Sequence, residues 1–174
     1  MSEQLEIRIA EGMTLDARER EDVLSLCSQA YEIDYEPLFD TLNGATHVVA
    51  YYQGKLVSHA LWVTRWLQCG DAPALRTAYV EAVATHAAVR RMGFATAVMH
   101  VVADSILDFE LGGLCPAEAS LYLRLGWEFW RGPLAIRTPN AILPTPEEAR
   151  VMILRLPKTP PLDLDLPLSA EWRE

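Results

Sequence analysis

The chain has 174 residues, of which 51% are hydrophobic and 22% are charged, a composition typical of one globular domain that buries a proper core. The formal net charge of −9 argues against nucleic acid or an anionic membrane surface as a partner, because both need a basic face, and it favours a cationic substrate. The N-terminus lacks the features of an export signal and no apolar run reaches about 18 residues, so we expect a cytoplasmic protein.

The first half of the chain predicts a strand, a helix and a β-hairpin. Apolar and charged residues alternate at the start, and Asp16 then precedes an amphipathic pattern as a helix cap would. An acidic and aromatic stretch follows and ends before the Asn43-Gly44 turn. The predicted strands are Leu5–Ile9, His47–Tyr52 and Leu56–Thr64, the last two joined at Gln53-Gly54-Lys55.

The second half predicts a mixture of strands and helices, which completes an α/β domain of residues 1–174. Its strands would join a mixed, mostly antiparallel sheet flanked by helices. Glycines mark the expected helix ends, with Gly112-Gly113 after the first helix and Gly126 after the second. The predicted elements are a strand Leu75–Thr85, a helix Ala95–Phe109, a short strand Leu114-Cys115, a helix from Pro116 or Ala117 to Leu125, an antiparallel pair Glu128–Thr138 and Val151–Leu156, and an extended tail after Pro157.

Cysteines and histidines give no sign of a metal site. The three cysteines are odd in number and form no CxxC pair, so we expect neither zinc nor a disulfide framework. The histidines show no ligand spacing, and buried or surface roles suit them better than metal binding. These residues are Cys27, Cys69 and Cys115, and His47, His59, His86 and His100.

A short basic loop lies between the predicted strand Leu75–Thr85 and the helix that begins at Ala95. Its sequence is Arg90-Arg91-Met92-Gly93-Phe94-Ala95. A strand, a loop with one glycine and a helix start together present backbone N–H groups to a phosphate. The pattern R-x-x-G-x-A is weak by itself, and the bland alternative is a basic helix start. In this context it predicts a phosphorylated cofactor.

Together with Tyr122 in Ala119–Trp127, this loop resembles the GNAT superfamily of acetyl-CoA-dependent acyltransferases. The resemblance implies a GNAT fold and acetyl-CoA as co-substrate, without a metal. It also implies that the cofactor pyrophosphate is bound by Arg90, Arg91, Met92, Gly93, Phe94 and Ala95.

Four further segments resemble the aminoglycoside 2'-N-acetyltransferases. They are Tyr79–Ala84, Gly126–Pro133, Thr145–Glu148 and Glu171-Trp172-Arg173. The similarity runs from about His47 to the end of the chain. It implies transfer of acetyl to the 2'-amine of a cationic aminoglycoside, antibiotic resistance and a homodimer.

The same resemblance implies the catalytic roles. Glu81 would remove a proton from the substrate amine through ordered water, and Tyr122 would act as general acid toward the departing thiolate. The Val83 N–H would stabilise the oxyanion, and the backbones of Val83 and Thr85 would pair with the pantetheine arm. The alternatives are a solvent-facing glutamate and a core tyrosine.

Substrate binding is expected to be mostly acidic, because aminoglycosides carry several ammonium groups. For each acidic group the alternative is a solvated surface residue. Trp130 and Trp172 would either stack on sugar faces or close the core. The candidate substrate-binding residues are Asp34, Glu36, Asp40, Glu81, Ala82, Glu147, Glu148, Trp172 and Glu174.

The chain differs from these relatives at its end, because it stops at Glu174, two residues after Trp172. A shorter tail favours a smaller acceptor such as kasugamycin. Two other functions stay open. One is a GNAT enzyme acting on a polyamine, an amino sugar or a protein N-terminus; the other is a coenzyme A-binding module without turnover. The presence of both Glu81 and Tyr122 argues against the second.

Overall fold

The computed structural model describes residues 4–11 and 15–171. The chain divides into two compact units, one of residues 1–63 with 80–104 and the other of residues 64–79 with 105–174. Strands β3 (Lys55–Cys69) and β4 (Leu75–Thr85) run through both units, so each unit holds a part of each strand.

In the first unit, an antiparallel group of strands forms the framework. Strand β1 (Leu5–Glu11) pairs with β2 (Thr46–Tyr52), and β2 pairs with the first part of β3. The β2–β3 hairpin turns at Gln53 and Gly54, both in the left-handed region with φ of 51° and 74°. This is the predicted hairpin, and β4 has its predicted bounds.

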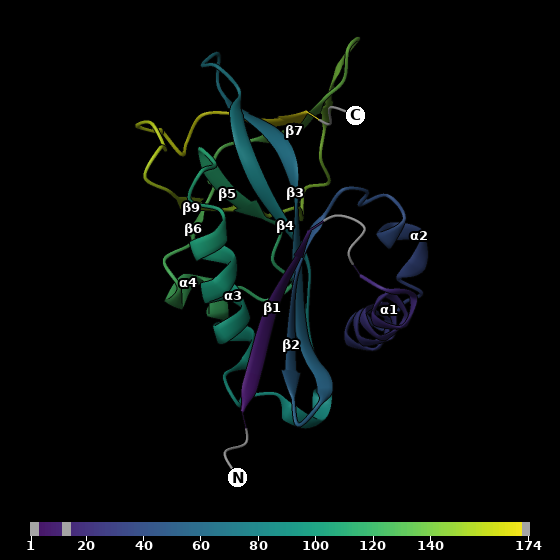
Figure 1. Cartoon of the computed structure of the whole chain (residues 1–174). Coiled ribbons are helices and arrows are strands. Elements are labelled where there is room, and N and C mark those ends of the chain that lie inside the picture. Colours follow the sequence, from purple (N-terminus) through teal and green to yellow (C-terminus); the bar gives the residue numbers. More distant parts are fainter. Residues whose placement is uncertain (1–3, 12–14, 172–174) are drawn as a thin grey trace. The chain divides into compact units, whose positions relative to one another are not determined.

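Three α-helices cover this framework. Helices α1 (Ala17–Tyr31) and α2 (Glu36–Phe39) lie on one side of the strands and α3 (Phe94–Ser105) on the other (Figure 1). The predicted cap is confirmed, because Asp16 accepts a hydrogen bond from the Glu19 N–H in a capping box. Helix α2 was not predicted.

The second unit holds most of the sheet. Strand β10 (Leu168–Glu171) is antiparallel to β3 and parallel to β7 (Leu134–Arg137), and the pairs β5–β9, β6–β9 and β7–β8 are antiparallel. The strand order is β6 (Glu128–Phe129), β9 (Met152–Arg155), β5 (Leu111–Leu114), β4, β3, β10, β7 and β8 (Ile142–Pro144). The mixed, mostly antiparallel sheet of the sequence prediction is confirmed.

Helix ends in the second half differ from the prediction. Helix α3 ends at Ser105 and not at Phe109, and α4 (Ser120–Arg124) begins later than Pro116. The Glu118 carboxylate accepts hydrogen bonds from the Ser120 N–H and hydroxyl, which fixes the turn before α4. Gly126 follows α4 with φ of 87°, so the predicted stop is confirmed.

The prediction that Gly112-Gly113 ends a helix is wrong, because both glycines lie inside the buried strand β5. A Cβ at Gly112 would lie 3.1 Å from Leu154 Cβ and 3.2 Å from the Trp127 ring. A Cβ at Gly113 would lie 3.1 Å from the Tyr79 ring. These glycines therefore allow close packing of neighbouring side chains and do not serve as a helix stop.

The C-terminal segment is also more ordered than an extended tail. It contains β10, which lies between β3 and β7. Residues 128–138 form two short strands, of which β6 pairs with β9 as predicted and β7 pairs elsewhere. Within residues 4–11 and 15–171, no helix is long and apolar enough to cross a membrane.

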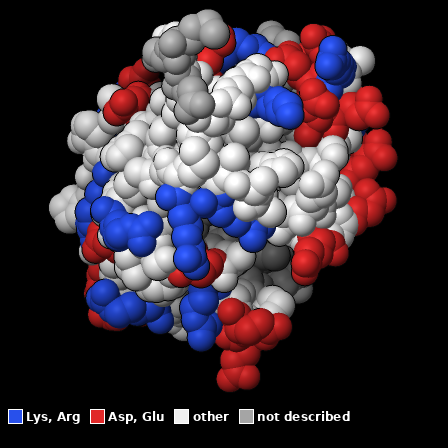
Figure 2. All heavy atoms as spheres, turned by 90° about the horizontal axis from the view of Figure 1, so that it is seen from below, with Lys and Arg blue, Asp and Glu red and all other residues white. Residues whose placement is uncertain are grey.

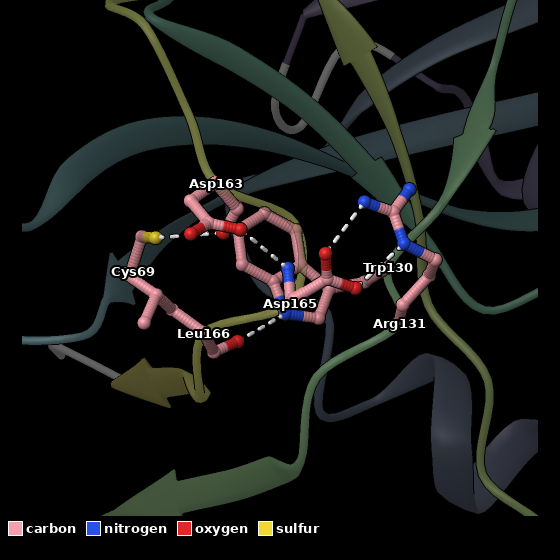
Figure 3. A network of polar contacts seen from close by, with 6 residues as sticks. All are labelled: Cys69, Trp130, Arg131, Asp163, Asp165 and Leu166. Carbon is pink, nitrogen blue, oxygen red and sulfur yellow. Dashed lines mark hydrogen bonds and ion pairs between the residues drawn. The ribbon is translucent and has the colours of Figure 1, made fainter.

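A network of hydrogen bonds fastens this C-terminal segment to the Trp130–Pro133 segment (Figure 3). The Trp130 indole N–H donates to the Leu166 carbonyl at 2.8 Å, and the N–H groups of Arg131 and Gly132 both donate to the Leu164 carbonyl. The Arg131 guanidinium pairs with Asp165 at 2.7 Å. A Cβ at Gly132 would overlap the carbonyl group of Leu166, so only glycine fits there.

Gly132→Ala is expected to lower the free energy of unfolding by about 1–3 kcal/mol, because the added methyl forces the Leu166 backbone away. Urea unfolding measures the loss. The matched control is Arg131→Ala, which removes an exposed ion pair and should cost at most about 1 kcal/mol. A Gly132→Ala protein as stable as the wild type would contradict this account.

Candidate functional site

The end of β4 in the first unit carries the predicted base. Glu81, Val83 and Thr85 are half-buried, while Ala82 and Ala84 between them are 2% and 3% exposed. The Thr85 hydroxyl is hydrogen-bonded to the Ser58 hydroxyl at 2.9 Å, and Ser58 also donates to the Ala84 carbonyl. The three half-buried residues therefore lie on a fixed backbone and remain partly exposed to solvent.

The backbone at Ala82 leaves the regular strand conformation. Its φ is 53°, in the left-handed region that alanine rarely adopts. The Ala82 carbonyl accepts a hydrogen bond from His59 Nδ1 at 2.8 Å and a longer one from the Cys27 thiol at 3.9 Å. The Tyr31 hydroxyl donates to the Val83 carbonyl at 3.0 Å. Side chains thus donate hydrogen bonds to the carbonyls of both Ala82 and Val83.

Tyr35 is a buried tyrosine whose pKa is raised by its burial and in part by the charge of Glu81. The tyrosine is 2% exposed, and burial is the main reason why the pKa of its hydroxyl lies well above the usual range. The nearby Cys27 and Glu81 raise this pKa further. The negative charge of Glu81 therefore disfavours ionisation of the buried Tyr35 hydroxyl, which stays protonated at neutral pH.

The basic loop and the start of α3 have the geometry of an anion site. Arg90 and Arg91 are exposed, and φ is 67° at Arg91 and 87° at Gly93. A Cβ at Gly93 would meet nothing within 4 Å, so the space in front of the loop is open. The first turn of α3 offers backbone N–H groups and carries no acidic side chain. These features fit a pyrophosphate.

Phe94, predicted to contact the cofactor, is mainly a core residue. Its side chain is 6% exposed and its ring lies 5.1 Å from the Tyr52 ring. This contact anchors the start of α3 on the hairpin. Met92 is 53% exposed.

In the second unit, Tyr122 lies on α4 with its side chain 8% exposed. Its ring packs edge-on against Trp127 at 6.2 Å. Burial, and next the charge of Glu118, raise the pKa of the hydroxyl to about 12. Tyr122 is therefore protonated at neutral pH.

A hollow of about 740 Å³ in the second unit brings together two predicted motif segments. The Trp130–Pro133 segment forms one part of its wall, and Thr145, Pro146 and Glu147 form another. Glu147 is the single predicted acid in this wall, which also contains Arg131 and Arg150. Glu148 is exposed and does not line the hollow.

The acidic set after α1 is partly neutralised by Arg20. Its guanidinium lies 2.8 Å from Asp40 and 3.7 Å from Glu36, and Asp34 accepts a hydrogen bond from the Glu36 N–H. All three acids are exposed. On the face drawn in Figure 2, acidic side chains follow one margin and several basic side chains gather in another area.

Other predicted residues fall outside the site or the described chain. Trp130 is 5% exposed and packs in a core cluster with Leu67, Leu111 and Ile153, so it closes the core. Trp172 and Glu174 lie outside the described residues. Among the residues that are described, no group of three or more His, Cys, Asp and Glu side chains could hold a metal ion.

Sequence reasoning missed a buried histidine pair beside Ala82. His47 Nδ1 lies 3.0 Å from His59 Nε2, and the two side chains are 5% and 0% exposed. The hairpin register pairs His47 with Leu61 and Val49 with His59, which places the histidines as diagonal neighbours on one face. Counted from the predicted turn, a regular ladder would place the two histidines on opposite faces, and a register shift between Ala50 and Tyr51 brings them to the same face. No local signal in the sequence marks this shift.

Comparisons with known proteins agree with this fold. A family model described as an acetyltransferase (GNAT) domain matches residues 13–130. An aminoglycoside 2'-N-acetyltransferase from Mycolicibacterium fortuitum is 32% identical over 174 residues, covering 96% of this chain and 89% of that protein.

Solved structures agree at the level of the fold. The GNAT family N-acetyltransferase YhbS from Escherichia coli, in complex with CoA, has a TM-score of 0.66 at 16% identity, covering 99% of this chain and 93% of that chain. Eis1 from Mycobacterium abscessus has a TM-score of 0.63 at 22% identity and covers 76% of this chain. This chain spans only 32% of the Eis1 chain.

Stability should depend on pH through the histidine pair. Burial lowers the pKa of His47 to about 4 and that of His59 to about 3, from 6.5. At a pH between the ordinary histidine pKa of 6.5 and the lower pKa of the folded protein, the unfolded chain binds more protons than the folded one. The stabilisation is therefore complete above pH 6.5 and is lost as the pH drops toward 4. His47 alone should account for roughly 2 kcal/mol between pH 7.5 and pH 5.

Urea unfolding at pH 7.5 and pH 5 measures this difference. His47→Phe should reduce it, while His100→Asn, which changes an exposed histidine, should keep it. An equal dependence on pH in wild type and His47→Phe would contradict the assignment.

Proposed function

Because the chain belongs to the GNAT family of N-acetyltransferases, we propose that it is an acetyl-CoA-dependent aminoglycoside 2'-N-acetyltransferase that confers resistance. The observation that carries the proposal is the M. fortuitum relative of that name, which is similar over 96% of this chain. Acetylation would remove one positive charge and one donor from a drug that binds ribosomal RNA through such groups.

The cofactor would be held by the loop before α3. Acetyl-CoA supplies an activated acetyl group as a thioester. The exposed Arg90 and Arg91 and the first N–H groups of α3 would bind its pyrophosphate, and the open space at Gly93 leaves room for close approach.

Glu81 would then prepare the acceptor amine. An ammonium has no lone pair for attack, so one proton must leave, and a half-buried carboxylate on a fixed strand is suited to accept it through water. The Val83 N–H would face the acetyl oxygen as negative charge develops there. Thr85 and Val83 would contact the pantetheine arm through their backbones.

Tyr122 is better suited to donate a hydrogen bond than to transfer its proton. Moving a proton from a hydroxyl with a pKa of about 12 to a thiolate whose acid has an ordinary pKa of about 8.5 is uphill by about 5 kcal/mol. A protonated tyrosine still stabilises the departing sulfur as a donor. The coenzyme A thiolate would finally take a proton from solvent.

Each unit carries its own candidate acidic groups for binding the acceptor. They are Asp34, Glu36 and Asp40 in the first unit, and Glu147 and Glu148 in the second. The partial neutralisation by Arg20 leaves fewer free carboxylates for a large polycationic drug, so the second candidate class is another small amine, a polyamine or an amino sugar.

We also propose a cytoplasmic homodimer. Acetyl-CoA is available in the cytoplasm. Strand β8 ends the strand order of the second unit and exposes Ile142 and Leu143 by 60% and 49%, as an edge that pairs with a second copy would. Light scattering on the purified protein tests the dimer.

A panel of amines tests the substrate. The protein is mixed with acetyl-CoA and kasugamycin, gentamicin, tobramycin, spermidine or glucosamine, and thiol release is followed. Acetylation of an aminoglycoside at the 2'-amine, identified by NMR of the product, is the expected result. Acetylation of spermidine or glucosamine without acetylation of any aminoglycoside would contradict the proposed substrate class and support the second one.

Changes at the two catalytic candidates should separate their roles. Glu81→Gln is expected to lower kcat about 100-fold or more, because it removes the proton acceptor. Tyr122→Phe should lower kcat by only about 10-fold, because it removes one hydrogen bond. Steady-state kinetics gives kcat, and calorimetry should give an acetyl-CoA Kd close to the wild-type value for both variants.

The loop provides the opposite pattern as a control. Arg90→Ala and Arg91→Ala should raise the Kd and KM for acetyl-CoA and leave kcat nearly unchanged at saturation. Wild-type cofactor affinity in both variants would remove the arginines from the proposed site.

A further inference from the structure

The histidine pair of the first unit is joined directly to the backbone of the proposed catalytic strand. His59 Nδ1 lies 2.8 Å from the Ala82 carbonyl oxygen, and His59 Nε2 lies 3.0 Å from His47 Nδ1. Both rings are buried, and the His47 ring also packs 5.7 Å from that of Phe39. A continuous chain of contacts therefore runs from α2 through β2 and β3 to β4.

The contacts fix the tautomer of each ring. A carbonyl oxygen only accepts hydrogen bonds, so His59 must carry its proton on Nδ1. The neutral His59 ring then has a lone pair on Nε2, and His47 must donate to it from Nδ1. Any other neutral arrangement loses at least one of the two hydrogen bonds.

The hydrogen bond from His59 stabilises an unfavourable backbone conformation. A left-handed alanine costs about 1–2 kcal/mol and persists only where the surroundings hold it. Relaxation of Ala82 to the extended region would rotate the peptide groups on either side of it. It would also leave the buried His59 N–H with only the Cys27 sulfur, a weak acceptor 3.9 Å away.

We propose that His59, with its tautomer set by His47, is a positioning residue that holds Ala82 left-handed and thereby aims the Glu81 carboxylate and the Val83 N–H. This inference rests on the proposed roles of Glu81 and Val83. The two histidines act through the Ala82 backbone and touch neither the cofactor nor the amine.

The geometry gives the proposal a specific functional consequence. Glu81 and Val83 are the immediate neighbours of Ala82, so a change of φ at Ala82 turns both of them. A misplacement of about 1 Å in a catalytic group can lower a rate about 100-fold. The loop at Arg90–Ala95 is a separate segment, so cofactor affinity should change little.

A pair of substitutions at His59 separates positioning from packing. The Asn side chain places an N–H₂ donor at the position of Nδ1, so His59→Asn keeps the bond to Ala82 and loses the bond from His47. His59→Leu fills similar space and loses both bonds. Both variants should be less stable than wild type, because each leaves a buried polar group unpaired.

Activity should differ between these two variants in spite of their similar loss of stability. His59→Leu is expected to lower kcat about 100-fold with the acetyl-CoA Kd within about threefold of wild type. His59→Asn should retain kcat within about fivefold. His100→Asn, at an exposed position on α3, is the matched control and should behave as wild type. Equal kcat values for His59→Leu and wild type would overturn the proposal.

The tautomers can be measured without any substrate, on the wild-type protein, which removes the risk that a variant does not fold. Imidazole ¹⁵N chemical shifts at neutral pH should show protonated Nδ1 and unprotonated Nε2 for both His47 and His59. In His47→Phe, which keeps a ring beside Phe39 but no donor, a fraction of His59 should change to the Nε2-protonated form.

If the panel finds no aminoglycoside product, the proposed substrate fails, while the kcat comparison can use any amine that is turned over. A wild-type His59 protonated on Nε2 would overturn the positioning role regardless of substrate.

Discussion

The left-handed backbone at Ala82 is the constraint on which the proposed chemistry of the first unit depends. A regular strand satisfies its N–H and C=O groups with neighbouring strands and leaves them no freedom to face a ligand. At Ala82, side chains donate to the carbonyl, from His59 on β3 and from Cys27 on α1. Tyr31, the last residue of α1, holds the next carbonyl. One helix and one strand therefore stabilise one unusual residue.

The sequence predicted those parts of the fold in which one local signal dominates. The bounds of β4, the hairpin turn and the Asp16 cap follow from alternation, turn chemistry and capping, which need no knowledge of distant residues. Gly112-Gly113 was misread because a helix stop and a tightly packed strand call for the same residue. Strand β10 was missed because its pairing partners, β3 and β7, are far away in the sequence.

The candidate site divides in the same way. The loop at Arg90–Ala95 and the candidates Glu81 and Tyr122 came from resemblance and spacing, and the geometry of each is compatible with its proposed role. The histidine pair required the hairpin register, and the φ of Ala82 has no local signal, because glycine would be the usual residue in that conformation. An alanine held there by hydrogen bonds becomes visible only when the partners are placed.

The motif that narrows the resemblance most has a structural explanation. Trp130, Arg131 and Gly132 each form hydrogen bonds with the segment Leu164–Leu166, and Gly132 is required by the Leu166 carbonyl. These residues therefore hold the C-terminal segment in place, whatever the acceptor is. A motif shared by relatives can thus serve the packing of the fold, so other groups must account for recognition of the substrate.

For binding a cationic acceptor, the position of each carboxylate matters more than the net charge of the chain. The net charge of −9 does not by itself create an acidic pocket, since Arg20 neutralises part of one predicted set and two arginines share the hollow with Glu147. Exposed carboxylates are also weakened by water and salt. Glu81 is half-buried and lies near enough to the buried Tyr35 to influence its pKa, so its field is less screened. The group that attracts an ammonium most strongly would then also be the one that takes its proton, and recognition and activation of the amine would depend on the same fixed turn of β4.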